Sequence, residues 1–314
     1  MTPFASQTRF AFTLVACTTL LAQNPPSPRP ERSCAPLPHN RPTFGFVLIP
    51  AGSYSVGKAG SGRNPLRTTH IDSFFLAIYE TSNRQFAAFI AATHYITDAE
   101  KHHNAMVFQP GLGEFRWLQD STASWRWPNG ITRGGIGDRM DHPVTCISYR
   151  DALAYCTWAK MRLPTLEEWE IACRAGTTTD YFFGATDDRI GEYANIWHGH
   201  DHLKPDHGDD YMYTSPVGKF KPNPWGLYDM YGNVFEFCTG KLSPTESPAT
   251  AHGRGGSWWC SKNSCHSFNS SDIGSINIHA SFSNMGFRAA TAPGPTLVIP
   301  PSTRPSAPAH APSR

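Results

Sequence analysis

Residues 226–237, GLYDMYGNVFEF, combine glycines and turn-forming residues with aromatic side chains, a pattern that continues well beyond this stretch. From Tyr181 to Arg288 the sequence consists almost entirely of turns, short strand-like runs and glycines. Few helices, little regular strand and many aromatic residues predict an irregular, loop-rich α+β domain held together by loop packing.

Regular elements are expected mainly upstream of this region. Residues 46–49 (FVLI), followed by the turn PAG, predict a short strand. Thr81 can cap a helix that has apolar residues at helical spacing. A sequence similar to a capping box predicts a helix over residues 148–159. A second box, with Pro just before it and Gly just after the helix, predicts another over residues 165–176.

The N-terminus has the pattern of an export signal. Arg9 precedes an apolar run that ends at Ala22, and the run is too short to span a bilayer. We expect residues 1–22 to be a signal peptide and the product to be secreted, periplasmic or in the secretory pathway. Residues 14–17 (LVAC) are also similar to a bacterial lipobox, so Cys17 is a candidate lipid anchor. Alternatively, the mature protein begins near Thr43.

Proline marks the ends of the remaining chain. Residues 23–42 predict a stiff, Pro-rich linker, and residues 292–314 predict a disordered Pro-rich tail. Between them, residues 43–291 form one continuous domain without an internal repeat. No other segment is apolar enough to cross a membrane. The net charge of +2 and scattered Lys and Arg do not favour a nucleic-acid partner.

Two cysteines lie close together in residues 255–265, GGSWWCSKNSC. Only four residues separate Cys260 from Cys265, and a Gly-Gly turn and two tryptophans precede them. Such a loop can hold both sulfurs against one small thiophilic ion, and two thiolates suit Cu(I). The alternatives are a local disulfide or two unrelated buried thiols.

Cysteine count bears on the same question. Export implies an oxidising compartment, where unpaired thiols tend to be used or lost. Without Cys17 seven cysteines remain, an odd number, so at least one thiol is free, shared with another chain or bound to metal. The pairing of the others stays open: Cys34, Cys146, Cys156, Cys173 and Cys238.

Four segments, in order from Phe46 to Ala290, together resemble the formylglycine-generating enzyme (sulfatase-modifying factor) family. The resemblance implies this family's irregular α+β fold, a relative of the C-type-lectin fold, for the domain at residues 43–291. The matching segments are 46–52 (FVLIPAG), 162–170 (RLPTLEEWE), 226–237, and 254–258 (RGGSW) with 286–288 (GFR).

The resemblance implies a copper-dependent oxidase that uses O₂. Cys260 and Cys265 would hold Cu(I), and the thiolate of a cysteine in a sulfatase-type protein substrate would add as a third ligand. Hydrogen would then leave the substrate Cβ, and formylglycine would result. Cys265 is the residue implied to exchange disulfides with the substrate, and Ser257 is implied to line the oxygen pocket.

Two other functions remain open on the same fold. One is a non-catalytic ligand-binding module that exposes aromatics such as Trp258 and Trp259. The other is a related oxidase that acts on a different substrate.

The resemblance also implies two structural calcium sites, built from side-chain oxygens and backbone carbonyls as Ca²⁺ accepts. In each site, two side chains would be joined by carbonyl oxygens from neighbouring residues. The first set is Asn195, Ile196, Asp209 and Tyr211. The second is Asp229, Gly232, Val234 and Glu236. Alternatively, Asp229 and Glu236 only hydrogen-bond a turn.

The loop between Ile196 and Asp209 of the first calcium set is rich in histidine. Its spacing is compatible with zinc, although surface loops commonly collect histidines and the resemblance implies no transition metal here. The residues are His198, His200, His202 and His207, with Asp201 and Asp206.

The chain departs from the family pattern near the second cysteine. Ser264 stands where catalytic relatives carry Tyr, and residues 266–269 (HSFN) replace an Arg-rich stretch. Phe235 stands where the family generally has Trp. These changes concern substrate grip and oxygen handling, so they put recognition of the usual sulfatase motif in question. Cys156 and Cys173 match disulfide-bonded cysteines of relatives, but the partner positions here are Ala289 and Ser270.

Overall fold

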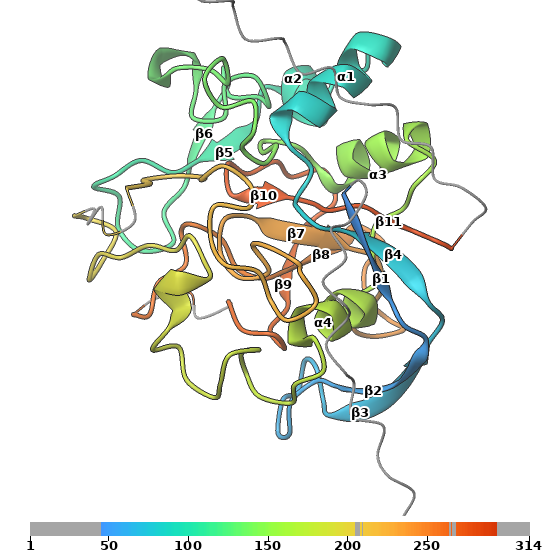
Figure 1. Ribbon diagram of the computed structural model, residues 1–314. Coiled ribbons are helices and arrows are strands. Elements are labelled where there is room, and N and C mark those ends of the chain that lie inside the picture. The colour runs from blue at the N-terminus through green and yellow to red at the C-terminus, as the bar shows by residue number, and fades with distance from the viewer. Residues whose placement is uncertain (1–44, 205–207, 209, 264, 266–267, 294–314) are drawn as a thin grey trace, which may run out of the picture. The chain divides into compact units, whose positions relative to one another are not determined.

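The computed structural model describes residues 45–204, 208, 210–263, 265 and 268–293 (Figure 1). These residues all fall in one unit, Pro36–Arg314. The expected signal peptide, the lipid-anchor candidate Cys17, the Pro-rich linker and residues 294–314 of the expected tail lie outside the described residues. The predictions for these segments therefore remain predictions.

Each of the four described α-helices begins with a capping box. The N-cap side chain accepts from the backbone N–H three residues on, and that residue's side chain accepts in return from the N-cap N–H. This reciprocal pair satisfies two donors that a helix start otherwise leaves open. The helices are α1 (Asn83–Thr93), α2 (Asp98–His102), α3 (Tyr149–Trp158) and α4 (Leu166–Arg174).

The expected cap of the first helix is wrong by one residue. Ser82, not Thr81, caps α1. Thr81 is held one position earlier because its N–H donates to the Phe287 carbonyl at 2.8 Å and its carbonyl accepts from Val144 N at 2.9 Å. Long-range backbone pairing therefore fixes where the helix starts. The boxes expected at Ser148 and Thr165 are confirmed.

In the described part of the chain, short strands form four small sheets, and two 3₁₀ turns, η1 (Ile131–Arg133) and η2 (Ile190–Glu192), lie between helices and strands. The sheets have the strand orders β1-β4-β11, β10-β7-β8-β9, β2-β3 and β5-β6. The strands are β1 (Phe46–Ile49), β2 (Gly52–Val56), β3 (Arg67–Ile71), β4 (Phe74–Ala77), β5 (Ala105–Val107), β6 (Leu118–Asp120), β7 (Phe235–Cys238), β8 (Thr250–Arg254), β9 (Gly274–Asn277), β10 (Met285–Gly286) and β11 (Ala290–Thr291).

Distant segments meet at the centre of this unit. β11 pairs antiparallel with β4, and β10 pairs parallel with β7 (Figure 1). Helix α4 contacts β2 and β8 and is tied to β8 by a buried ion pair between Glu170 and Arg254, 2.9 Å apart. The last strands of the domain thus pair with strands that come much earlier in the chain. Between β8 and β9 runs the cysteine loop.

The expected fold class is confirmed: the chain is α+β, and the described residues form four short α-helices and short strands. Two large apolar clusters form the core, one around Trp169 of α4 and one around Phe86 of α1. Within the described residues, none of the helices has the length and apolar character needed to cross a bilayer.

Candidate active site

The cysteine loop starts at two glycines that the surrounding structure requires. Gly255 and Gly256 have φ of +89° and +74°, in the left-handed region that favours glycine. A Cβ at Gly256 would lie 2.9 Å from the Phe268 Cα, closer than two carbons can approach. The Gly232 N–H donates to the Gly255 carbonyl at 2.8 Å. Residues 226–237 therefore support the turn that begins the cysteine loop.

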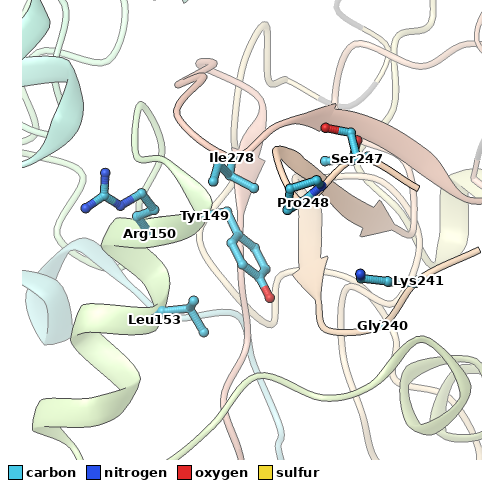
Figure 2. A pocket seen from close by; sticks show the side chains of 9 residues that line it. Tyr149, Arg150, Leu153, Gly240, Lys241, Ser247, Pro248 and Ile278 are labelled. Atoms are coloured by element: carbon cyan, nitrogen blue, oxygen red, sulfur yellow. The ribbon is translucent and has the colours of Figure 1, made fainter. Parts of the chain in front are cut away.

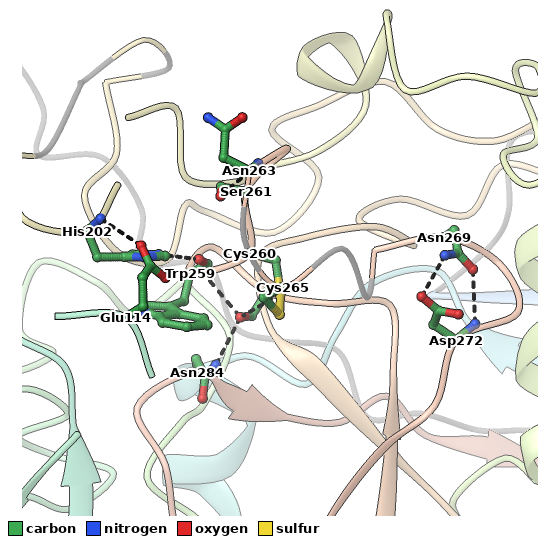
Figure 3. Close-up of a disulfide and its surroundings, with 11 residues drawn as sticks. Glu114, His202, Trp259, Cys260, Ser261, Asn263, Cys265, Asn269, Asp272 and Asn284 are labelled. Atoms are coloured by element: carbon green, nitrogen blue, oxygen red, sulfur yellow. Dashed lines mark hydrogen bonds and ion pairs between the residues drawn. A yellow bond between two sulfur atoms is a disulfide. The ribbon is translucent and has the colours of Figure 1, made fainter. Parts of the chain in front are cut away.

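Cys260 and Cys265 are brought together, and their sulfurs form a disulfide (Figure 3). Their Cα atoms are 4.8 Å apart. Cys260 is fully buried, whereas Cys265 is partly buried. The sequence left a shared ion and a local disulfide open, and the structure holds the disulfide. In this state the sulfurs are not thiolates, so any metal chemistry at the pair requires prior reduction.

Ser257 is buried beside this pair, and its hydroxyl oxygen accepts two hydrogen bonds. The donors are Asn284 Nδ2 at 2.9 Å and the Trp259 N–H at 3.3 Å (Figure 3). Because both lone pairs are engaged, the hydroxyl proton is left to donate, and Cys260 Sγ lies 3.9 Å away. The backbone carbonyl of Asn284 accepts from Phe235 N at 2.9 Å, so β7 orients the residue that orients Ser257.

Aromatic rings close one side of the loop. Trp258 and Trp259 are only 1% and 3% exposed, and both pack against Phe108, with ring centroids 6.0 and 6.3 Å away. The Trp197 N–H donates to the Cys260 carbonyl at 2.8 Å. The alternative in which Trp258 and Trp259 are exposed to a ligand is therefore wrong for these side chains. Their rings instead belong to an apolar cluster against which Cys265 packs.

No further disulfide forms among the described residues. Four other cysteines are free and buried: Cys146, Cys156, Cys173 and Cys238. Burial raises the pKa of the Cys156 and Cys173 thiols to about 12, which makes them poor nucleophiles. Cys173 Sγ lies 3.6 Å from Ser270 Oγ, where relatives were expected to carry its partner. Cys34 lies outside the described residues.

The first expected calcium set is partly described. Asn195 Nδ2 donates to the Tyr213 carbonyl at 2.8 Å, which leaves the side-chain oxygen buried and without a partner among the described residues. Ile196 is buried next to it, and Tyr211 lies two residues before Tyr213, whereas Asp209 lies outside the described residues. An amide oxygen that lacks a donor fits an oxygen-seeking cation.

The two carboxylates of the second expected calcium set have different partners. The Glu236 carboxylate accepts from the buried Arg288 guanidinium at 2.5 Å and from Trp169 Nε1 at 2.7 Å. A carboxylate oxygen can accept from more than one partner, so the place of Glu236 in the calcium set stays a prediction. Asp229 differs, because one carboxylate oxygen accepts from Gly218 N at 2.6 Å and the other has no partner among the described residues.

A third buried carboxylate, Glu80, belongs to the same neighbourhood. One of its oxygens accepts from Asn233 Nδ2 at 2.8 Å, and the other has no partner among the described residues. Burial, with Asp229 and Glu236 nearby, raises the pKa of Glu80 well above its ordinary value. Three carboxylates face one guanidinium here, so full ionisation would leave two negative charges uncompensated. A divalent cation at the open oxygens, or protonation, would remove that excess.

Asp229 gives a pH-dependent prediction. Burial raises its pKa from 3.8 to about 7. Between these values the folded chain holds a proton that the unfolded chain lacks, so the unfolding free energy should fall as the pH rises. In Asp229→Asn, measured with a chelator present, this loss between pH 4 and 7 should shrink by about 4 kcal/mol.

Urea denaturation of both proteins at several pH values measures this difference. Parallel curves for the two proteins across the interval would show that Asp229 titrates normally.

Within its described residues, the histidine loop does not form the zinc arrangement that its spacing allowed. Both ring nitrogens of His202 are engaged, one 2.8 Å from the Glu114 carboxylate and the other 2.7 Å from the Trp259 carbonyl. The His200 side chain is 93% exposed, and His207 lies outside the described residues. In the described part of the chain, no three His, Cys, Asp or Glu side chains gather as a metal-binding group.

A separate surface cavity of about 400 Å³ lies between α3 and residues 240–250 (Figure 2). Tyr149, Arg150 and Lys241 contribute to its lining. None of its lining residues belongs to the cysteine loop or to either calcium set. The cavity is therefore distinct from the candidate active site.

Sequence reasoning did not identify several residues that shape the site. Asn284 orients Ser257, and Glu114 holds His202, which the sequence indicated only as a zinc candidate, against the backbone of the cysteine loop. Glu80 adds to the buried negative charge. Each lies far from its partner along the chain, so no local pattern announces it. Only the fold brings these groups together.

Known proteins resemble this chain over most of its length. Residues 32–293 match the sulfatase-modifying factor enzyme 1-like domain. The formylglycine-generating enzyme of Bos taurus is 34% identical over 287 residues, covering 81% of this chain and 76% of that protein. The formylglycine-generating enzyme of Thermomonospora curvata is 35% identical over 285 residues, covering 79% and 94%.

Other similar proteins bear names that do not state this activity. The inactive C-alpha-formylglycine-generating enzyme 2 of Bos taurus is 32% identical over 238 residues, covering 70% of this chain and 78% of that protein. Among solved structures, PvdO from Pseudomonas aeruginosa has a TM-score of 0.56 at 23% identity, covering 79% and 94%. Treponema denticola variable protein 1 has a TM-score of 0.55 at 20% identity, covering 79% and 95%. These two structures bear on the fold only.

Proposed function

The chain belongs to the sulfatase-modifying factor enzyme 1-like family, and from this membership we propose that it converts a cysteine of a sulfatase-type protein substrate into formylglycine. Two relatives at 34% and 35% identity bear the name of that activity. A relative at 32% bears the name of an inactive protein, so identity by itself does not decide. The observation that carries the proposal is the meeting of Cys260 and Cys265 in one loop.

The overall reaction is an oxidation at the substrate Cβ. The substrate side chain, one O₂, two protons and two electrons become an aldehyde, hydrogen sulfide and water. The C–S bond and a C–H bond break, and a C=O bond forms. A thiol reductant supplies the two electrons and is itself oxidised to a disulfide. The same reductant opens the Cys260–Cys265 bridge seen in the structure.

Once reduced, Cys260 and Cys265 present two soft ligands on one short loop. This donor set fits Cu(I), which prefers thiolates and accepts low coordination numbers. When bound, copper would supply the activation of O₂ that a bare peptide cannot perform. The protein's own contribution is to hold the two sulfurs close together and to bury Cys260 in the apolar cluster around Trp169.

Ser257 would provide a directed proton donor at this place. Asn284 and the Trp259 N–H occupy its lone pairs, so its hydroxyl proton remains available on the side of Cys260. A donor in that position can stabilise negative charge that develops on an oxygen atom. Asn284 acts as the positioning residue for Ser257.

Structural calcium and export remain parts of the proposal. The open oxygens of Asn195 and Asp229 support a cation at each position. Export through residues 1–22, with lipidation of Cys17 as the alternative, would place the reaction outside the cytoplasm. The residues proposed to hold calcium are Asn195, Ile196, Asp209 and Tyr211 at the first site, and Asp229, Gly232, Val234 and Glu236 at the second.

Copper binding tests the proposed metal role directly. We expect the reduced protein to bind one Cu(I) per chain, because both thiolates lie close together on one short loop. Cys260→Ser and Cys265→Ser should each weaken that binding by more than about 100-fold. Competition with a chromogenic Cu(I) chelator measures both affinities.

Cys173→Ser serves as the matched control, because Cys173 is a buried thiol outside the loop. Equal Cu(I) affinity in all four proteins would rule out the loop as the copper site.

A further inference from the structure

The chain segment from Trp197 to His202 holds both peptide groups that flank Cys260. The Trp197 N–H donates to the Cys260 carbonyl at 2.8 Å. His202 Nε2 lies 2.7 Å from the Trp259 carbonyl, which belongs to the peptide bond leading into Cys260 (Figure 3). Trp197 Nε1 also donates to the Asp201 carbonyl at 2.9 Å, which closes the segment on itself. One short stretch therefore fixes the backbone on either side of the buried sulfur.

The His202 ring is fully buried and faces an acceptor at each nitrogen. Nδ1 lies 2.8 Å from both carboxylate oxygens of Glu114, and Nε2 faces the Trp259 carbonyl. A carbonyl can only accept, so Nε2 donates to Trp259, and Nδ1 shares a hydrogen bond with the Glu114 carboxyl group. The ring is therefore held at both nitrogens.

Ring stacking reinforces this position. The His202 ring stacks on Trp259 with centroids 4.1 Å apart and planes at 11°, and it lies 4.8 Å from the Trp197 ring. Stacked aromatic rings of this kind attract one another. The same residue that holds the Trp259 carbonyl therefore also holds the Trp259 side chain.

We propose that His202, held by Glu114, is a positioning residue that fixes the peptide group before Cys260 and so sets the redox behaviour of the Cys260–Cys265 pair. The catalytic meaning of this inference rests on the proposed function, whereas the redox effect does not. A fixed backbone keeps the two sulfurs close together after reduction, which favours their re-oxidation. A loosened backbone gains conformational freedom in the dithiol form, which favours reduction.

Two substitutions at His202 distinguish the effect of its hydrogen bonds from the effect of its ring. His202→Phe keeps a ring that can stack on Trp259 but removes both ring nitrogens. His202→Gln keeps an amide donor that can reach the Trp259 carbonyl. His252→Phe is the matched control, because His252 is also fully buried and paired with a glutamate, Glu246, at 2.9 Å, but belongs to β8.

The experiment equilibrates the full chain in glutathione buffers of stepped potential, alkylates free thiols and measures the bridged fraction of Cys260 and Cys265 by mass spectrometry. We expect His202→Phe to make the bridge about tenfold easier to reduce, a shift of about 30 mV. His202→Gln should stay within about twofold of the unmodified protein. His252→Phe should leave the equilibrium unchanged.

A wild-type equilibrium in folded His202→Phe would overturn the inference, and so would an equal shift in His252→Phe. If His202→Phe does not fold, Glu114→Ala takes its place, since the Glu114 side chain is 38% exposed and its loss leaves the core intact. That variant should ease reduction about threefold, and an unchanged equilibrium contradicts the proposal. The readout requires no formylglycine, so a chain that makes none but shows the shift refutes only the proposed function.

Discussion

Replacing either loop cysteine is expected to abolish formylglycine formation. Cys260→Ser and Cys265→Ser each remove one of two sulfurs that the fold brings onto one short loop. A serine hydroxyl is neither a soft ligand nor a partner for thiol exchange. Turnover of a cysteine peptide should therefore fall by about a thousandfold or more, because residues that act as a unit lose most of their effect together.

The double variant provides a further check on this expectation. If the cysteines act as a pair, Cys260→Ser/Cys265→Ser should be scarcely worse than either single variant. Cys238→Ser, at a buried free thiol outside the loop, should keep its turnover. Losses that add in the double variant would mean that the two sulfurs act separately.

Removal of Arg288 is expected to have the largest effect on stability. Its guanidinium is fully buried, binds the Glu236 carboxylate at 2.5 Å and donates to the Tyr228 carbonyl at 2.9 Å. Arg288→Met would leave a buried carboxylate without its partner, near Glu80 and Asp229. Breaking such a pair costs about 3–5 kcal/mol, so the unfolding free energy from urea denaturation should fall by this amount.

An exposed ion pair gives the comparison. Arg84 Nε lies 3.0 Å from Asp141, and the two side chains are 48% and 70% exposed. Arg84→Met should change the unfolding free energy by less than about 1 kcal/mol. A similar small change for Arg288→Met would show that the buried carboxylates are protonated and do not need the guanidinium.

Local sequence signals predicted the helices well where a cap and an apolar face coincide. The boxes at Ser148 and Thr165 marked α3 and α4 correctly. The cap of α1 was placed one residue early, because Thr81 is drawn into backbone pairing with Phe287. The short helix α2 has its own capping box at Thr97, a local signal that the prediction overlooked.

Long-range pairing could not be inferred from the residues. Parallel pairing of β10 with β7 joins residues about fifty positions apart through two-residue contacts, too short for any sequence pattern to specify. That fold was predicted from the resemblance to a known family and not from local sequence patterns. The family match and the α+β architecture confirm it.

The candidate site shows the same contrast between local signals and long-range contacts. Cys260, Cys265 and Ser257 were identified in the sequence, and the structure brings them together. The sequence did not reveal that Arg288 pairs with Glu236, because that partner is 52 residues away. Local patterns identify groups inside one loop and miss contacts whose partners come from another part of the chain.

Product analysis tests the central claim most directly. The reduced, full-length chain is incubated with Cu(I), O₂, a thiol reductant and a peptide that contains the cysteine motif of a sulfatase. Mass spectrometry should then find peptide that has lost one sulfur and two hydrogens, gained one oxygen and reacts with a hydrazide as an aldehyde does. Recovery of the cysteine peptide unchanged, while the protein is folded and copper-loaded, would contradict the proposed activity.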